Sequence, residues 1–273
     1  MSKVEVHYGA STDVGRVRQV NEDSFLASPP VFVVADGMGG HSGGDVASRI
    51  VVEEFAALVD SDLDARAGAA AVADLLVKAQ SRINRYGIEK RLSGADKWYA
   101  GTTAVVGLLV ADDGVPKWLL ANLGDSRIYR FGDGVLEQVS VDHSVVQELV
   151  EAGTITVEEM STHPERHVVT RALGGPDDAE ADFFLLPLVA VERLMLCSDG
   201  INAMIDDDVI AAILGEVEDP RDAADRLVAA ALAAGGRDNA TAVVVDVVGL
   251  RTDDADDSAP LRVSLEQKLG ALP

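Results

Sequence analysis

The stretch VVADGMGGHSGGDVASRI, from Val33 to Ile50, joins an apolar run to a glycine-rich loop and then to a helical pattern. The apolar run has the composition of a buried strand, yet it leads straight into the charged side chain of Asp36. The loop that follows contains five glycines, which give it little stiffness of its own. A carboxylate in such a loop needs a compensating partner, and the rest of the sequence has to supply it.

The composition is that of a globular protein of 273 residues with a large excess of acidic groups. Its 48% hydrophobic content can form a core, and Cys197, the only cysteine, can form neither an internal disulfide nor a CxxC site. The formal charge of −23 argues against nucleic acid and anionic membranes as partners and attracts cations. No apolar run is long enough to span a membrane, and no secretory signal is recognisable. We expect a cytoplasmic monomer that does not insert into membranes.

The pattern along the chain predicts short strands and paired helices. Alanine-rich windows predict helices over residues 44–58 and 65–86, and a second pair over 206–214 and 220–234. Apolar stretches bounded by Gly, Pro or Asp predict strands over 4–8, 24–27, 31–35, 103–110, 117–121, 126–131, 181–185, 193–197 and 241–247. Short turns such as Gly132-Asp133-Gly134 join neighbouring strands as antiparallel hairpins, so the expected class is α+β with layered sheets.

The same reading predicts one large domain over residues 1–250. Residues 145–175 mix short helical pieces with Thr, Ser, His and Pro, which is typical of a mobile insert rather than a core element. Residues 251–273 begin with the acidic cluster Asp253-Asp254 and Asp256-Asp257, and we expect them to form a flexible tail outside the domain.

Aspartates flanked by small residues recur at the boundaries of predicted strands. They are Asp36, Asp125, Asp199 and Asp238, and Glu22-Asp23 adds a further acidic element before Ser24. One such aspartate is as often a helix cap or a turn residue, but four at converging strand ends favour a shared site. Converging carboxylates repel unless a cation holds them, and oxygen-only ligands select hard ions such as Mg²⁺ or Mn²⁺. Gly37, Gly39 and Gly40 would let the backbone bend sharply and offer a carbonyl as a further ligand.

Two arginines, Arg16 and Arg18, precede the Glu22-Asp23 pair. A guanidinium group holds phosphate through two parallel hydrogen bonds, so arginine among metal-binding carboxylates suggests a phosphate-bearing substrate. Hard metal ions can lower the pKa of a shared water and place it in line with phosphorus, and no protein nucleophile is then required. The pattern therefore indicates metal-dependent phosphoryl chemistry.

The segments RVRQVNEDS, VVADGMGGH, GTTAVVGLL, ANLGDSRIYR, DHS, VTRALGG, LCSDG and GGRDNATAVVV follow one another between about Gly9 and Val247. Together they resemble the metal-dependent Ser/Thr protein phosphatases of the 2C type, in their bacterial form. The resemblance implies a four-layer αββα sandwich, in which two antiparallel sheets are flanked by helix pairs and metal ions lie between the sheets. It also implies a signalling hydrolase that cleaves phosphoserine and phosphothreonine in proteins with a metal-activated water.

The resemblance assigns a metal-binding role to most of the acidic residues. It implies that Asp36 bridges two Mn²⁺ or Mg²⁺ ions, that Gly37 offers its carbonyl to one, and that Asp199 and Asp238 complete the other. Glu22 and Asp23 would act through metal-bound waters. Asp125 would contribute, with Asp199, to a third and weaker ion.

The resemblance also suggests catalytic and substrate-binding residues. Arg18 matches the arginine that grips the substrate phosphate, whereas Arg16 is interpreted as a surface charge. His41 is the candidate general acid, although related enzymes carry that histidine directly after the Asp-Gly pair, where Met38 stands here.

The insert over residues 145–175 corresponds to the flap beside the active site of these enzymes. His163 and Arg166 are its candidates for substrate contact, with solvated loop charges as the alternative for each. His143 is interpreted as a structural residue that caps the helix beginning near Val145.

Other classes of phosphatase lack a residue that they require. A cysteine-dependent enzyme needs an arginine six places after Cys197, where Ala203 stands, and a haloacid dehalogenase needs a second aspartate at Met38. A binuclear His/Asp enzyme needs a histidine near Gly124-Asp125, and none is there. An inactive relative that only binds phosphoproteins, or a scaffold with structural metal, remains the alternative to an enzyme. The expected partners are phosphorylated proteins, either a Ser/Thr kinase and its targets or a phosphorylated anti-sigma antagonist.

Overall fold

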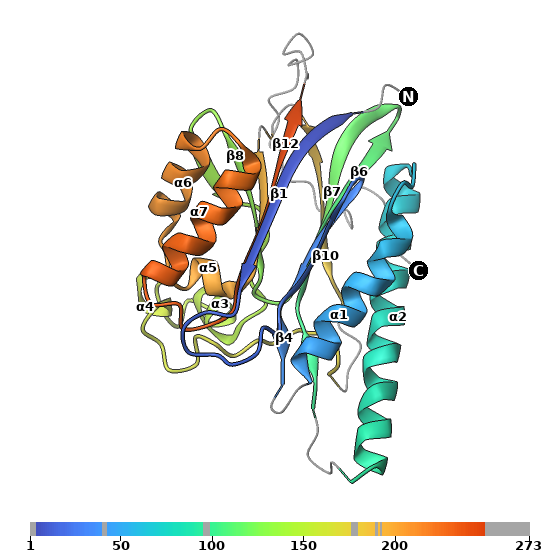
Figure 1. Ribbon diagram of the computed structural model, residues 1–273, viewed down its shortest axis with the longest axis vertical. Helices are drawn as coiled ribbons and strands as arrows, with labels where there is room; N and C mark the ends of the chain where they lie inside the picture. The colour runs from blue at the N-terminus through green and yellow to red at the C-terminus, as the bar shows by residue number, and fades with distance from the viewer. Residues whose placement is uncertain are drawn as a thin grey trace.

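A computed structural model describes residues 4–39, 43–94, 99–175, 180–188, 191 and 193–248. Within them, two five-stranded antiparallel sheets pack face to face with helices on both outer sides (Figure 1). Helices α1 (Gly44–Phe55) and α2 (Ala65–Leu92) cover one sheet, and α6 (Asp207–Glu216) and α7 (Pro220–Ala233) cover the other. The α+β sandwich of four layers that the sequence predicts is confirmed. No described helix is long and apolar enough to cross a bilayer.

Each sheet combines strands from distant parts of the chain. In spatial order, the first sheet contains β1 (Glu5–Asp13), β12 (Ala240–Val248), β11 (Arg193–Cys197), β8 (Arg127–Gly132) and β9 (Val135–Gln138). The second contains β10 (Asp182–Pro187), β7 (Val115–Leu123), β6 (Ala104–Asp112), β3 (Val31–Ala35) and β2 (Ser24–Ser28). A small ribbon pairs β4 (Gly37–Met38) with β5 (Gly101–Thr102).

Short helices complete the described part of the chain. They are the 3₁₀ turn η1 (Ala56–Leu58), α3 (Val145–Glu151), α4 (Val157–Met160) and α5 (Asp199–Asn202). Helix α2 runs beyond its predicted end at Tyr86 as far as Leu92, and Lys90 and Arg91 in its last turn complement the negative end of the helix dipole.

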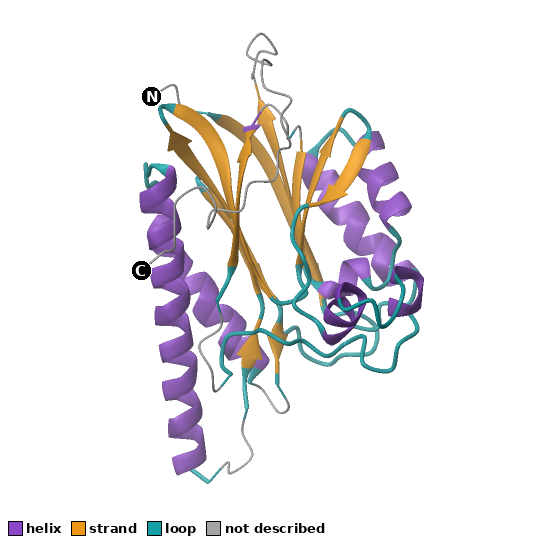
Figure 2. Cartoon of the chain, turned by 180° about the vertical axis from the view of Figure 1, so that it is seen from behind, coloured by secondary structure: helices purple, strands orange, loops and turns teal. Residues whose placement is uncertain are grey.

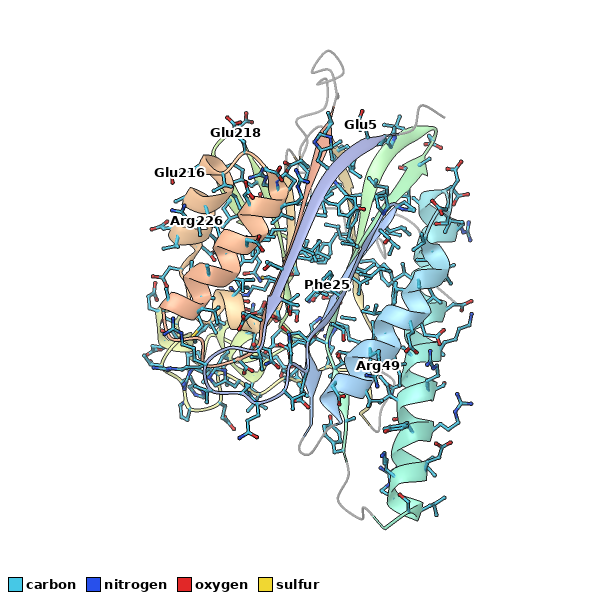
Figure 3. The ribbon with its side chains drawn as sticks, in the orientation of Figure 1. Glu5, Phe25, Arg49, Glu216, Glu218 and Arg226 are labelled. Atoms are coloured by element: carbon cyan, nitrogen blue, oxygen red, sulfur yellow. The ribbon has the colours of Figure 1, made fainter. Side chains whose placement is uncertain are left out.

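Three apolar layers explain why the central strands have almost continuous apolar sequences. In β3, Val31 and Val33 face α1 and α2, whereas Phe32 and Val34 face the other sheet. Both faces of this strand are covered, so period-two alternation of polar and apolar residues is absent. The layer between the sheets includes the edge-to-face pair of Phe32 and Trp118, 5.9 Å between ring centroids, and Phe25 packs against it (Figure 3). A third layer lies between the first sheet and α6 and α7.

The register of the ladders brings the functional loops to one end of the sandwich. Ser24 pairs with Ala35, and Ala104 pairs with Leu123, so the loops bordering four strands of the second sheet lie together. In the first sheet, Cys197 pairs with both Ala242 and Arg127, which aligns the end of β11 with the starts of β12 and β8. Figure 2 shows loops from both sheets gathered at its lower end.

Candidate active site

Five aspartates border strands at this end of the sandwich. They are Asp23, Asp36, Asp125, Asp199 and Asp238. Asp125 lies in the short segment that crosses from β7 in one sheet to β8 in the other, so both sheets contribute to the group. Asp238 precedes its strand, but the antiparallel register places the start of β12 beside the end of β11.

Four of these carboxyl groups, those of Asp23, Asp36, Asp125 and Asp199, have raised pKa values. Burial is the largest cause of the raised pKa of Asp36, and repulsion from Asp23, Asp199, Asp125 and Asp238 adds to it. Burial likewise raises the pKa of Asp125 to about 8, with repulsion from Asp199 and Asp142 as further causes. The structure therefore places several acidic groups where they cannot all ionise without a compensating cation.

Asp36 and Asp199 come close enough to share a hydrogen bond. Burial and repulsion from Asp238 raise the pKa of Asp199, and the hydrogen bond with the Asp36 side chain opposes that rise. A hydrogen bond between two carboxyl groups requires a proton on one of them. A cation between them would take the place of that proton.

The backbone of Asp36 is held by Thr102, at the end of β5, and by Thr103, which directly precedes β6. The Asp36 N–H donates to Thr103 Oγ1 at 3.0 Å, and its carbonyl accepts from Thr102 Oγ1 and the Thr103 N–H, both at 2.9 Å. Thr103 Oγ1 also bonds Ser126 Oγ at 2.7 Å, next to Asp125. The buried hydroxyl groups thus connect the loops of two candidate ligands.

Gly37 allows a close approach of three chain segments. A Cβ atom on Gly37 would lie 2.3 Å from the Gly44 carbonyl oxygen and 2.4 Å from that of Glu22. Gly37 belongs to β4, and neither Gly37 nor Gly39 has a positive φ. The lack of space for a side chain is therefore a physical reason for glycine at position 37.

Asn239 holds the loop that carries Arg18. Its Oδ1 accepts the Glu22 N–H at 2.8 Å, and its Nδ2 donates to the carbonyls of Val14 and Val20 at 2.9 and 3.0 Å. Arg18 Nη2 donates to Asp238 Oδ2 at 2.7 Å, while half of the Arg18 side chain stays exposed. The ion pair with Asp238 raises the pKa of Arg18, against the effect of desolvation. The guanidinium group is thus fixed at the edge of the carboxylates and still accessible.

Asp23 is the most deeply buried of these carboxyl groups, with 9% of its surface exposed. Its Oδ2 accepts from Thr241 Oγ1 at 2.6 Å and from Ser198 Oγ at 2.7 Å, whereas its Oδ1 is buried without a hydrogen-bond partner. Burial raises its pKa to about 7, although the two hydroxyl bonds lower it. Glu22 is less buried, and desolvation is the main cause of its raised pKa.

The residues present fit hard divalent cations. The candidate donors are carboxylate and carbonyl oxygens, and one buried oxygen of Asp23 has no partner. In the described ranges, no three His, Cys, Asp or Glu side chains close around a single point. A pair of ions that share Asp36 and also use the Gly37 carbonyl and water would not need such a tight cluster.

His163 and Arg166, which the sequence suggests for substrate contact, make local contacts within the flap. His163 Nδ1 accepts the Glu165 N–H at 3.2 Å, and Arg166 Nη1 donates to the His163 carbonyl at 3.1 Å. Another described flap residue, His167, acts on the acidic group, because its electrostatic effect is among the smaller causes that lower the pKa of Asp199. Sequence reasoning missed His167, although it directly follows Arg166. His41 lies outside the described residues.

Two other sequence interpretations are refined by the structure. Ser144, and not His143, caps α3, because the Ser144 side chain accepts the Gln147 N–H at 3.3 Å. Cys197 is fully buried at the end of β11, and burial raises the pKa of its thiol to about 12. A thiol with such a pKa is not a nucleophile at neutral pH, which agrees with the exclusion of a cysteine-dependent mechanism.

The sequence profile of the protein phosphatase 2C family matches residues 15–234. PstP, a serine/threonine protein phosphatase of Mycobacterium tuberculosis, is 38% identical over 245 residues, which cover 89% of this chain and 45% of PstP. The serine/threonine phosphatase stp of Listeria monocytogenes is 34% identical over 248 residues, covering 88% of this chain and 96% of that protein. The chain therefore belongs to the protein phosphatase 2C family, and it spans less than half the length of the mycobacterial relative.

A solved structure supports the same assignment. The crystal structure of the catalytic domain of PstP in complex with two manganese ions has a TM-score of 0.73 and 34% identity to this chain. The match covers 89% of this chain and 99% of that one. The two-sheet fold and the family assignment thus agree.

The raised pKa values predict how stability depends on pH in the metal-free protein. Asp23 and Asp125 have pKa values of about 7 and about 8 in the folded state, against about 3.9 for an unfolded aspartate. Between about pH 4 and pH 8 the folded state binds more protons, so the free energy of unfolding falls as pH rises. Mn²⁺ binds the ionised carboxylates and should offset this fall, so the gain in Tm from Mn²⁺ should be larger at about pH 8.5 than at about pH 5.5.

Thermal unfolding with chelator and with Mn²⁺ checks this prediction. Asp23→Asn removes one titrating carboxyl group, so it should flatten part of the decline with chelator, whereas general charge repulsion would leave the slope unchanged. A Tm in chelator that rises steadily toward high pH would contradict the electrostatic description of the site.

Proposed function

We propose that this chain is a protein serine/threonine phosphatase that hydrolyses phosphoserine and phosphothreonine with the help of bound metal ions. One observation carries the proposal: buried aspartates from both sheets converge beside Arg18, whose guanidinium group is fixed by Asp238 and still half exposed. Membership of the protein phosphatase 2C family supports the same activity. The manganese-bound PstP structure supports a requirement for metal.

The chain offers ligands for two core ions, Mn²⁺ or Mg²⁺. Asp36 would bridge them, the Gly37 carbonyl would complete one site, and Asp199 and Asp238 the other. Glu22 and Asp23 would bind ordered water around the ions, and Asp125 would serve a weaker third ion. When bound, such ions activate a water for attack on phosphorus and neutralise charge on the phosphate oxygens.

The protein's own residues bind and orient the substrate. Arg18 can hold two phosphate oxygens through its guanidinium group, and the bond to Asp238 limits the positions that this group adopts. His41 remains the candidate proton donor for the leaving serine or threonine oxygen. His163 and Arg166 in the flap are proposed to contact the polypeptide around the phosphorylated residue.

An inactive member of the family that only binds phosphoproteins is the alternative. The presence of Asp36, Asp199 and Asp238 together with Arg18 favours the enzyme, because a binding module has no need of the full acidic set. Turnover of an aryl phosphate with Mn²⁺ separates the two. Phosphorylated proteins, including Ser/Thr kinases and their targets, are the proposed partners. A cytoplasmic location, a monomeric state, a single domain over residues 1–250 and a flexible acidic tail stay predictions of the sequence, and residues 249–273 lie outside the described structure.

The first prediction of this proposal concerns metal removal. Hydrolysis of phosphoserine and phosphothreonine peptides should cease in excess chelator and return with Mn²⁺ or Mg²⁺. Asp36→Asn should reduce kcat by orders of magnitude, because it weakens a bridging ligand while leaving the core packed. Steady-state kinetics and circular dichroism check both statements. Full activity in chelator would exclude the metal-dependent mechanism.

Arg18→Ala should weaken substrate binding. Loss of a charge-assisted pair in a partly exposed site is expected to cost about 1–2 kcal/mol, or roughly five- to thirtyfold in kcat/KM. Arg18→Lys should recover only part of this loss, because a lysine keeps the charge without the planar fork. Arg16→Ala, an exposed position in the same loop, is the matched control and should have normal kinetics. Equal kinetic constants for Arg18→Ala and wild type would remove Arg18 from the site.

Asp125→Asn tests the third ion. The variant should keep the two core ions, since Asp36 and Asp238 are unchanged, but lose turnover and need more Mn²⁺ for the activity that remains. Isothermal metal titration and steady-state kinetics at varied Mn²⁺ check this. Asp133→Asn, at a turn aspartate with φ of 52°, is the control. Equal stoichiometry, metal dependence and kcat in Asp125→Asn and wild type would leave Asp125 a turn residue.

A further inference from the structure

The flap is joined to the sandwich by a short antiparallel stem. The stem consists of residues 143–145, where the flap begins, and residues 168–170, which lie in the last part of the flap. Ser144 and Val169 form a β-bridge, the Val145 N–H donates to the Val168 carbonyl, and the Thr170 N–H donates to the His143 carbonyl, both at 2.9 Å. These bonds tie the beginning of the flap directly to residues 168–170.

His143 connects this stem to the segment that carries Asp125. The His143 N–H donates to the Gly124 carbonyl at 2.9 Å, and the Gly124 N–H donates to His143 Nδ1 at 3.1 Å. The imidazole is buried, with 5% of its surface exposed. Because Nδ1 accepts a hydrogen bond, the proton of the neutral ring lies on Nε2. Nε2 faces Asp182 Oδ2 of β10 at 3.2 Å, and Arg171 Nη1, just beyond the stem, lies 3.4 Å from Asp182 Oδ1.

Asp142, the residue before His143, holds the chain on the C-terminal side of Asp125 through Arg127. Arg127 Nε and Nη2 donate to the carboxylate of Asp142 at 2.9 and 2.7 Å. Gly124, the partner of His143, has a φ of +112°, and a Cβ there would lie 2.5 Å from Thr103 Cγ2. The segment around Asp125 is thus confined on both sides, and the Asp142-His143 pair at the base of the flap supplies much of that confinement.

We propose that His143 is a positioning residue that couples the position of the flap to that of Asp125. A displacement of the stem pulls on the Gly124 peptide through two hydrogen bonds at once, and Gly124 has little room to absorb the movement. Through its bonds to Gly124, His143 holds the Asp125 carboxylate, and through its bond to Asp182 it holds the base of the flap, so loss of His143 affects metal requirement and substrate binding at once. This inference rests on the proposed function, because it assigns metal binding to Asp125 and substrate contact to the flap.

A purely structural role for His143 makes different predictions. Loss of a buried imidazole would then lower the Tm without a selective effect on metal or substrate. The coupling role predicts instead that His143→Ala raises the Mn²⁺ concentration for half-maximal activity at least fivefold and raises KM for a phosphopeptide. KM for a small aryl phosphate, which does not reach the flap, should change less than twofold.

Two conservative variants separate the two connections of the imidazole. His143→Asn can still accept the Gly124 N–H through its Oδ1 but is too short to reach Asp182, so it should restore the Mn²⁺ dependence and not the phosphopeptide KM. Asp182→Asn, at a side chain that is 43% exposed, keeps the bond to Gly124. It should raise the phosphopeptide KM with unchanged Mn²⁺ dependence, and it keeps the test available if His143→Ala does not fold.

The experiment combines kinetics with two readouts that need no turnover. Isothermal titration with Mn²⁺ should show a weaker affinity for the weakest ion in His143→Ala, and amide hydrogen exchange should become faster both around Gly124 and in residues 168–170. Arg193→Lys is the control, because Arg193 anchors the end of α6 to Asp246 in the pocket bounded by Phe131 and Gly215. This control should lower the Tm and leave Mn²⁺ dependence and local exchange around Gly124 unchanged.

The outcomes distinguish the inference from the function on which it rests. A wild-type protein that binds Mn²⁺ but has no phosphatase activity would refute the proposed function, while titration and exchange would still report on the coupling. An active wild type with unchanged Mn²⁺ affinity, phosphopeptide KM and Gly124 exchange in His143→Ala would overturn the coupling and leave His143 a packing residue.

Discussion

Carboxyl groups that converge in a space poor in water raise one another's pKa, and each must find a proton, a hydrogen-bond donor or a cation. At one end of this sandwich the register of ten strands brings five aspartates together, and burial is the largest cause of the raised pKa values of four of them, Asp23, Asp36, Asp125 and Asp199. Asp23 and Asp36 come from one sheet, Asp199 and Asp238 from the other, and Asp125 from the crossing between them. The five aspartates therefore come together only when the two sheets keep their relative position.

Neutral polar side chains hold the two sheets in this relative position. Asn239 binds three backbone groups of the loop from Val14 to Glu22, and Ser198 and Thr241 of the first sheet donate to Asp23 at the start of the second. Hydroxyl and amide groups suit this task, because a further charge would either neutralise or repel the carboxylates. Arg18 and Arg127 are exceptions: the charge of Arg18 is paired with Asp238 while part of its guanidinium group faces solvent, and the charge of Arg127 is paired with Asp142. The site is thus built from rigid neutral anchors around a charged centre.

The sequence could predict the elements whose signal is local. The fully apolar run of β3 and the alanine-rich helices were visible, and the aspartates at strand boundaries correctly suggested convergence. Asp199 and Asp238 lie close together because β11 pairs with β12, and hydrophobic patterning alone does not specify that pairing. Strand β9 was missed, because Val135–Gln138 is short and has no buried residue.

Other features depend on distances that no sequence pattern contains. The need for glycine at position 37 arises from the carbonyls of Gly44 and Glu22, which come from different elements. The role of Asn239 could be suspected only from its place beside Asp238, because its bonds reach back more than two hundred residues. Likewise, the sequence suggests His143 as a helix cap, and its partner Gly124 becomes apparent only when the flap stem is seen against the Asp125 segment.

The five aspartates and the flap are attached to the sandwich in different ways. The aspartates are held in place by the hydrogen bonds that join the two sheets. A change in the relative position of the sheets would therefore separate these carboxyl groups. The flap is attached through its stem, through the Thr102–Leu173 bridge and through Gln80, which binds Gly174 and Gly175. Exposed flap residues such as Arg166 and His167 can therefore change without disturbing Asp36 or Asp238. If Asp125 binds metal as proposed, changes that move the stem would also alter the metal requirement, because His143 joins the stem to the segment of Asp125.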